Sequence, residues 1–296
     1  NQEKRVFLSG NRTPARNIGF FTKQPATRPD WQHKSLASAN RVVDVFDTKN
    51  TMKEGAKVAD FSHVTTPLIE FKDVSFSYVD AAEHALEHID FTVNKGETVG
   101  IIGGTGSGKS TLVNLITRFY DATEGEVVIR DTNVKEYSTE SLRDRVGVVP
   151  QRAMLFRESI RDNIRWGKNN ATDEEIYKAL EIAQAREIVE GKEGKLDYVI
   201  NQGSKNLSGG QKQRITIARA LVKKPDILIL DDSASALDYA TDANLRKAIK
   251  ENTDNMTVFI VSQRSSSIKN ADKIVVLDDG KMVGFGTHEE LYKNCP

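Results

Sequence analysis

Apolar positions along this chain follow two patterns, which predict strands separated by helices. Alternating or short continuous apolar runs predict strands at residues 68–74, 88–93, 98–102, 126–129, 146–149, 226–230 and 257–261. Apolar residues at helical spacing predict helices at 110–119, 173–184 and 238–250. Strands that alternate with helices predict an α/β fold with a mostly parallel sheet that is covered on both faces.

The periodic spacing of apolar residues is weaker before residue 67, so the main domain is expected to span residues 67–296. Residues 1–35 carry seven Lys and Arg, two acids and three prolines without a sustained period. They predict an extended basic tail that is either solvated or in contact with lipid headgroups or a partner. Residues 36–66 predict a short helix and a polar linker; the helix follows Ser38, with apolar residues on one face at Ala39, Val42, Val43 and Phe46.

Composition narrows the possible partners and compartment. Forty-two Lys and Arg balance forty-two Asp and Glu, so no global basic field attracts nucleic acid. Cys295 is the one cysteine, which excludes a disulfide within the chain and suits a reducing compartment. The apolar runs are far shorter than the roughly 18 residues of a membrane span, and the start of the chain resembles no signal peptide.

A glycine-rich motif follows the strand expected at 98–102 and begins the next helix. It fits the pattern GxxxxGK[ST] and consists of Gly103, Gly104, Thr105, Gly106, Ser107, Gly108, Lys109, Ser110 and Thr111. Glycines let backbone N–H groups curl around phosphate oxygens, and the helix N-terminus adds positive potential. Lys109 can reach the β- and γ-phosphates, and Ser110 can ligate Mg²⁺. The motif therefore predicts ATP binding with Mg²⁺ rather than a ligand-free turn.

A carboxylate for the magnesium ion should lie at the end of a second buried strand. Asp231 follows four apolar residues at 227–230 and is the candidate. An Asp after a strand is more often a turn former, but the phosphate loop favours the metal-binding interpretation.

Residues 207–211 read Leu-Ser-Gly-Gly-Gln and are followed by Lys-Gln-Arg. Together with the phosphate loop and the Asp after the strand, this segment resembles the signature of the ABC ATPases, over about residues 67–296. The resemblance implies a P-loop cassette with a mostly parallel core sheet, an antiparallel β subdomain, and a helical subdomain at about 152–222 that carries the signature. In that family two nucleotide-binding domains pair head to tail around ATP. Ser208, Gly209, Gly210 and Gln211 would then contact the ATP held by the partner's phosphate loop.

Other positions can be carried over from the family singly. Tyr78 is similar to the aromatic residue that stacks on adenine, although a tyrosine of the core would look the same. Gln151 is similar to the glutamine that contacts Mg²⁺ and the attacking water. Residues 235–238 resemble the loop through which the two domains contact each other.

The chain departs from the family pattern at the residues that hydrolyse ATP. Active members have a Glu after the magnesium Asp and a His after the next strand, where this chain has Asp232 and Gln263. A carboxylate that is one methylene shorter lies about 1.5 Å further back, and a misplacement of about 1 Å can lower the rate about 100-fold. Gln263 can hydrogen-bond the γ-phosphate but cannot transfer a proton. The alternative is a slow homodimer in which both residues work adequately.

The resemblance therefore implies one half of a heterodimeric exporter with a degenerate site at its own phosphate loop and an intact signature for the competent site. The catalytic candidates are Lys109, Gln151, Asp232 and Gln263. The segment at 38–48 resembles the end of an exporter's transmembrane domain, which implies a place at the cytoplasmic face of the cell membrane. Asn201 and Gln202 stand where exporters usually carry an acid that contacts the transmembrane domain.

Other classes of ABC protein fit less well. An importer ATPase is usually free-standing and needs no such linker. A nucleic-acid ATPase of the SMC type inserts a coiled coil where only 98 residues separate Lys109 from Ser208. Ribosome-bound factors carry two cassettes on one chain. A structural pseudo-ATPase would bind ATP without linked transport.

Overall fold

The computed structural model describes residues 39–43, 46–47, 52–61, 67–253 and 255–294. The chain forms two units, 1–51 and 52–296. In the first unit, residues 39–43 and 46–47 are helical, as the apolar pattern predicts. The expected tail at 1–35, Ser38 and Cys295 lie outside the described residues. None of the described helices is long and apolar enough to cross a membrane.

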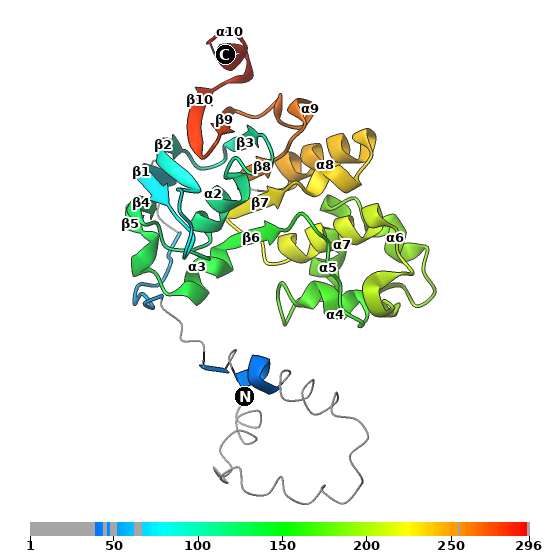
Figure 1. Ribbon diagram of the computed structural model, residues 1–296. Coiled ribbons are helices and arrows are strands. Elements are labelled where there is room, and N and C mark those ends of the chain that lie inside the picture. Colours follow the sequence, from blue (N-terminus) through cyan, green and yellow to red (C-terminus); the bar gives the residue numbers. More distant parts are fainter. Residues whose placement is uncertain (1–38, 44–45, 48–51, 62–66, 254, 295–296) are drawn as a thin grey trace, which may run out of the picture. The chain divides into compact units, whose positions relative to one another are not determined.

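The second unit is built on one sheet (Figure 1). The strands are β1 (Ile69–Phe76), β2 (Leu86–Val93), β3 (Thr98–Gly103), β4 (Glu124–Ile129), β5 (Thr132–Asn133), β6 (Val146–Val149), β7 (Ile227–Asp231), β8 (Thr257–Val261), β9 (Lys273–Asp278) and β10 (Lys281–Gly286). Their order is β5-β4-β1-β2-β10-β9-β3-β8-β7-β6. Strands β9, β3, β8, β7 and β6 are parallel, whereas β5, β4, β1 and β2 form an antiparallel side. This arrangement confirms the predicted fold class.

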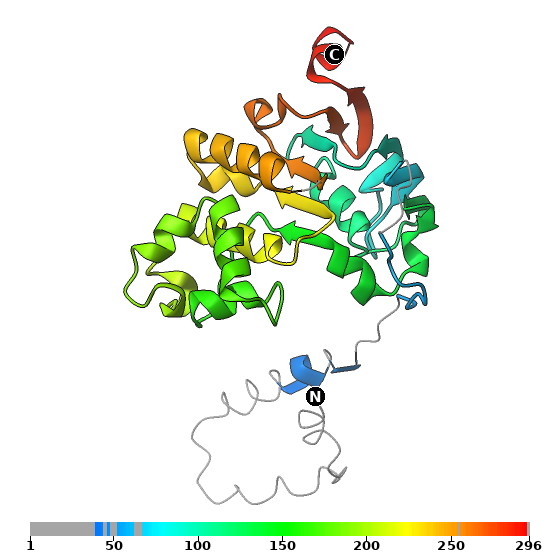
Figure 2. The ribbon, with the colours of Figure 1, turned by 180° about the vertical axis from the view of Figure 1, so that it is seen from behind.

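The helices divide between the two faces of the parallel strands. They are α2 (Lys109–Ile116), α3 (Thr139–Arg145), α4 (Ile160–Arg165), α5 (Asp173–Ile182), α6 (Arg186–Glu190), α7 (Gly209–Leu221), α8 (Tyr239–Asn252), α9 (Ser265–Ile268) and α10 (His288–Asn294). Both ribbon views show α4 to α7 gathered together, away from the antiparallel strands (Figures 1 and 2). These four helices fall within the residue range 152–222 that is expected for the helical subdomain.

Two hydrophobic cores lie on opposite faces of the parallel strands. Along β7, Ile227 and Ile229 join the core that contains α2 and the antiparallel strands. Leu228 and Leu230 join the core that contains α4 to α8. Successive side chains of a strand point to opposite faces, so a buried strand must be apolar throughout. The continuous apolar runs in the sequence reflect this burial on both faces.

The compact unit begins at Met52, before the boundary expected at residue 67. Residues 52–61 lie along the short 3-10 helix Val134–Glu136 and α3: the Lys57 amide donates to the Glu136 carbonyl (2.9 Å), and the Ala59 amide donates to Ser141 Oγ (3.0 Å). Ala59 and Phe61 are buried in the core. This part of the expected polar linker is therefore docked on the domain, because its few apolar residues are covered by partners distant in the sequence.

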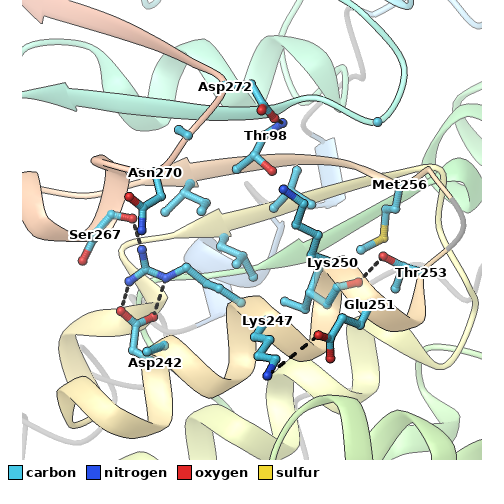
Figure 3. A pocket seen from close by; sticks show the side chains of 18 of the residues that line it. Thr98, Asp242, Lys247, Lys250, Glu251, Thr253, Met256, Ser267, Asn270 and Asp272 are labelled. Carbon is cyan, nitrogen blue, oxygen red and sulfur yellow. Dashed lines mark hydrogen bonds and ion pairs between the residues drawn. The ribbon is translucent and has the colours of Figure 1, made fainter. Parts of the chain in front are cut away.

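A cavity of about 730 Å³ lies between α8, β8 and α9 (Figure 3). The Arg246 side chain lines it, forms an ion pair with Asp242 on the same helix and donates to the Ser267 carbonyl. Burial lowers the pKa of the Arg246 guanidinium. This side chain therefore links α8 to α9.

Candidate active site

A cleft of about 380 Å³ lies at the carboxyl ends of β3, β6, β7 and β8. It is lined by Tyr78, Ala85, Thr105, Gly106, Gly108, Lys109, Ser110, Thr111, Gln151, Asp231, Asp232, Val261, Ser262 and Gln263. Open α/β sheets bind ligands at this edge. The structure thus brings together the phosphate loop and five of the residues that the sequence singles out elsewhere: Tyr78, Gln151, Asp231, Asp232 and Gln263.

The phosphate loop requires glycine at two positions for reasons of space. A Cβ at Gly103 would lie 2.2 Å from the Leu277 carbonyl oxygen of β9. Gly108 has φ +94°, and a Cβ there would lie 2.6 Å from the Ala85 carbonyl oxygen. A side chain at either position would therefore clash with a backbone carbonyl, and Gly108 is also the N-cap residue of α2, which begins at Lys109.

Lys109 lies within the curve of the loop. Its Nζ donates to the Gly103 carbonyl (2.9 Å) and the Gly104 carbonyl (2.5 Å), and lies 3.4 Å from Ser107 Oγ. Burial lowers the pKa of the ammonium group, against the opposing effect of Asp231 and Asp232. The Lys109 ammonium therefore donates to loop carbonyls, and phosphate oxygens could take their place as its hydrogen-bond acceptors.

Ser110 and Asp231 form the pair of oxygen donors expected for magnesium. Ser110 Oγ donates to both carboxylate oxygens of Asp231, at 3.0 and 3.2 Å. Burial raises the pKa of Asp231, Asp232 raises it further, and the Ser110 hydrogen bond opposes both. No cluster of three or more His, Cys, Asp and Glu able to hold a metal occurs in the described part of the chain. Mg²⁺ fits this donor set, because it takes one or two carboxylates and fills its other positions with water and phosphate oxygens.

Gln151 and Asp232 are joined across the mouth of the cleft. Gln151 Nε2 donates to Asp232 Oδ2 at 3.0 Å. The Asp232 amide donates to the Val261 carbonyl (2.9 Å), and its own carbonyl accepts from Ser235 Oγ (2.8 Å). Asp232 has φ +43°, a left-handed conformation that Asp tolerates better than most residues. The short carboxylate is thus fixed beside Asp231 and directed towards Gln151.

Tyr78 lies two residues beyond the end of β1 and lines the cleft. Its hydroxyl is hydrogen-bonded to Thr111 Oγ1 of the phosphate loop at 2.9 Å. The side chain lines the cleft instead of being enclosed in the core, which favours the binding interpretation over the core interpretation. Its role in stacking on adenine stays a prediction.

The signature residues do not line this cleft. Ser208 is the N-cap of α7: Ser208 Oγ accepts from the Gln211 amide (3.3 Å), and Gln211 Oε1 accepts from the Ser208 amide (3.1 Å). The reciprocal pair is a capping box, which fixes the start of the helix. Ser208 and Gly209 are exposed.

Sequence reasoning missed three residues that line the cleft: Ala85, Val261 and Ser262. Val261 and Ser262 adjoin Gln263 at the end of β8, so their position in the sequence was a usable signal. Nothing in the sequence marked Ala85, which lines the cleft because the start of β2 lies beside the phosphate loop.

The fold and this cleft define a phosphate-loop nucleotide-binding domain. The family model for ABC transporters matches residues 86–235, about half of the chain. The chain therefore belongs to the ABC transporter family.

Known proteins agree with this assignment. The chain is 40% identical, over 97% of its length, to an ATP-dependent lipid A-core flippase of Desulfotalea psychrophila, of which it covers 51%. It is 47% identical, over 75% of its length, to the putative multidrug export ATP-binding/permease protein YgaD of Bacillus subtilis, of which it covers 38%. A solved bacterial Atm1-family ABC exporter with ATP bound superposes with a TM-score of 0.79 at 31% identity, over 88% of this chain and 45% of that one. The chain thus spans about half the length, or less, of the relatives it matches.

Proposed function

We propose that this chain is the ATP-binding part of an ABC exporter, in which ATP binding and hydrolysis drive export of a substrate across the cell membrane. The observation that carries the proposal is the convergence of Lys109, Ser110, Asp231 and Gln151 on one cleft at the carboxyl edge of the sheet. These groups match the requirements of a nucleoside triphosphate with a divalent cation. Relatives named as a flippase and as an export ATP-binding/permease protein support the direction of transport.

Each group has a defined part in binding. Lys109 would exchange its hydrogen bonds with loop carbonyls for the β- and γ-phosphate oxygens. Ser110 and Asp231 would hold Mg²⁺, which would offset the negative charge of the phosphates. Gln151 would contact the ion and the attacking water. Tyr78 would stack on the adenine.

We further propose that the site at this chain's own phosphate loop is degenerate. The group that should orient or deprotonate the attacking water is Asp232, whose carboxylate accepts a hydrogen bond from Gln151. A Glu at this position would reach about 1.5 Å further, and a displacement of about 1 Å can change a rate about 100-fold. Gln263, which lines the same cleft, cannot take up and release a proton as His does. The loop therefore holds ATP with little hydrolysis.

The proposed partner is a second, non-identical ABC subunit that pairs head to tail with this one. The exposed start of α7 supports this arrangement, because Ser208 and Gly209 would present a hydroxyl and amides to a nucleotide outside this chain's cleft. The intact signature would complete the partner's competent site. A transmembrane domain, which the longer relatives suggest, would place the cassette at the cytoplasmic face of the membrane.

The test restores the expected catalytic pair in the complex assembled with the partner subunit. Asp232→Glu combined with Gln263→His should raise ATP turnover at this site, measured with the partner's own phosphate-loop lysine substituted by Ala to silence the other site. The purified chain alone should bind Mg-ATP and hydrolyse it very slowly. Rapid turnover by the unmodified chain alone, or purification from its native membrane only as a homodimer, would refute the degenerate heterodimer.

A further inference from the structure

Three aromatic rings from two separate elements meet beside the cleft. Phe76 and Tyr78 come from the end of β1 and the turn after it, and Tyr120 follows the C-terminal end of α2. The ring centroids of Tyr78 and Tyr120 are 5.3 Å apart at an interplanar angle of 86°, and those of Phe76 and Tyr78 are 4.9 Å apart at 83°. Phe76 and Tyr120 are also in contact, at 5.3 Å. Edge-to-face pairs at these distances are attractive.

The contacts hold Tyr78 from the first turn of α2 and from the segment that follows this helix. Thr111 in the first turn of α2 bonds the Tyr78 hydroxyl, and Tyr120, just beyond its last turn, contacts the Tyr78 ring. Phe76 is buried and supports both tyrosines, whereas Tyr78 and Tyr120 are 39% and 40% exposed. The same helix begins at Lys109, which belongs to the phosphate loop. The position of the Tyr78 ring is therefore tied to the element that holds the phosphates.

We propose that Tyr120 is a positioning residue that sets the Tyr78 ring at the place where it receives the base of the nucleotide. The proposal rests on the proposed function, since it requires that the cleft binds ATP. Tyr120 lies outside the lining of the cleft and acts through Tyr78. Its loss leaves the phosphate loop intact but allows the Tyr78 ring more positions. The effect should therefore fall on recognition of the base and leave recognition of the phosphates unchanged.

The experiment compares two ligands that share phosphates and differ in the base. Calorimetry on the full chain measures Kd for ATP and for inorganic triphosphate, each with Mg²⁺, in the wild type, Tyr120→Ala and Tyr120→Phe. An aromatic pair corresponds to a change of about 2- to 12-fold in an equilibrium constant. Tyr120→Ala should weaken ATP binding by about that factor and change triphosphate binding less than twofold, and Tyr120→Phe should restore wild-type values. Tyr292→Ala, at an exposed tyrosine of α10, is the matched control and should change neither Kd.

A double-mutant cycle separates positioning from a general loss of structure. In a Tyr78→Ala background, Tyr120→Ala should cause no further loss of ATP affinity. Full additivity of the two changes overturns the proposal, as does equal weakening of ATP and triphosphate or an unchanged ATP Kd in Tyr120→Ala. If the wild-type chain binds neither ligand, the proposed function fails and this inference fails with it; if it binds both and Tyr120→Ala has no effect, only this inference fails.

Discussion

Arg118 offers the sharpest test of how residues 52–61 are held on the domain. This residue, just after α2, is 1% exposed. Its Nε donates to Asp121 (2.9 Å), Nη1 to the Tyr137 carbonyl (3.1 Å) and Nη2 to the Lys53 carbonyl (2.5 Å). One guanidinium therefore joins its own segment to two others, at Lys53 and Tyr137, that are distant in the sequence. Arg118→Met keeps much of the apolar stem and removes all of these hydrogen bonds.

The expected loss of stability in Arg118→Met depends on the groups that are left without a hydrogen-bond donor. Breaking a fully buried ion pair costs about 3–5 kcal/mol, but the Asp121 side chain is 27% exposed, so the loss here is smaller, and Met also avoids the desolvation of the guanidinium. We expect the free energy of unfolding to fall by about 3 kcal/mol, because a buried carbonyl left without a donor costs about 1–3 kcal/mol by itself. In a domain of this size each kcal/mol corresponds to about 2–4 °C, so Tm should fall by about 6–12 °C.

Chemical and thermal unfolding of the full chain measures the loss, and hydrogen exchange shows where it falls. Exchange should increase at the amides of Lys57 and Ala59, which bond to Glu136 and Ser141. Lys57→Met is the control: its ion pair with Glu136 has side chains 57% and 50% exposed, and such pairs contribute about 0–1 kcal/mol. A loss below about 1 kcal/mol in Arg118→Met, with unchanged exchange, would refute the reasoning.

Further predictions concern the cleft and the signature. Lys109→Ala should weaken nucleotide retention yet leave part of the ATPase rate of the assembled complex. Ser208→Arg should nearly abolish the ATPase rate, because loss of one aligned hydrogen-bond donor lowers the rate about 100- to 1000-fold. Steady-state ATPase assays compare the two variants, and a larger loss in Lys109→Ala would place the weak site elsewhere. Burial raises the pKa of Asp231, so the folded state binds a proton on this carboxyl more tightly than the unfolded state does. Without ligand, the free energy of unfolding therefore falls as the pH rises through the raised pKa. Asp231→Asn should therefore raise Tm at neutral pH, and this gain should disappear below the ordinary pKa of Asp. The same variant should weaken magnesium-dependent nucleotide binding. A Tm equal to that of the wild type from neutral pH to below that pKa would contradict the raised pKa of Asp231.

Much of the fold could be predicted because its signals are local. The strand at 257–261 and the helix start at 173 depend on neighbouring residues, through a continuous apolar run and a side-chain cap. Strands β9 and β10 were not predicted, although their turn at Asp279 and Gly280, with φ of +45° and +76°, is a two-residue hairpin signal in the sequence. Helices α3, α4 and α6 are each seven residues or fewer, too short for a periodic pattern to stand out.

The sequence by itself determined the chemistry of the phosphate loop, since all its groups lie within nine consecutive residues whose spacing sets their geometry. Only the tertiary structure decided how distant groups contact it and one another. The hydrogen bond between Gln151 and Asp232, and the contact of Tyr120 with Tyr78, depend on the order and register of strands that pair across long stretches of chain. Residues 52–61 looked like a linker because their partners, such as Arg118, Glu136 and Ser141, are distant in the sequence. No periodicity within a segment encodes partners that only the packing of the whole domain brings within reach.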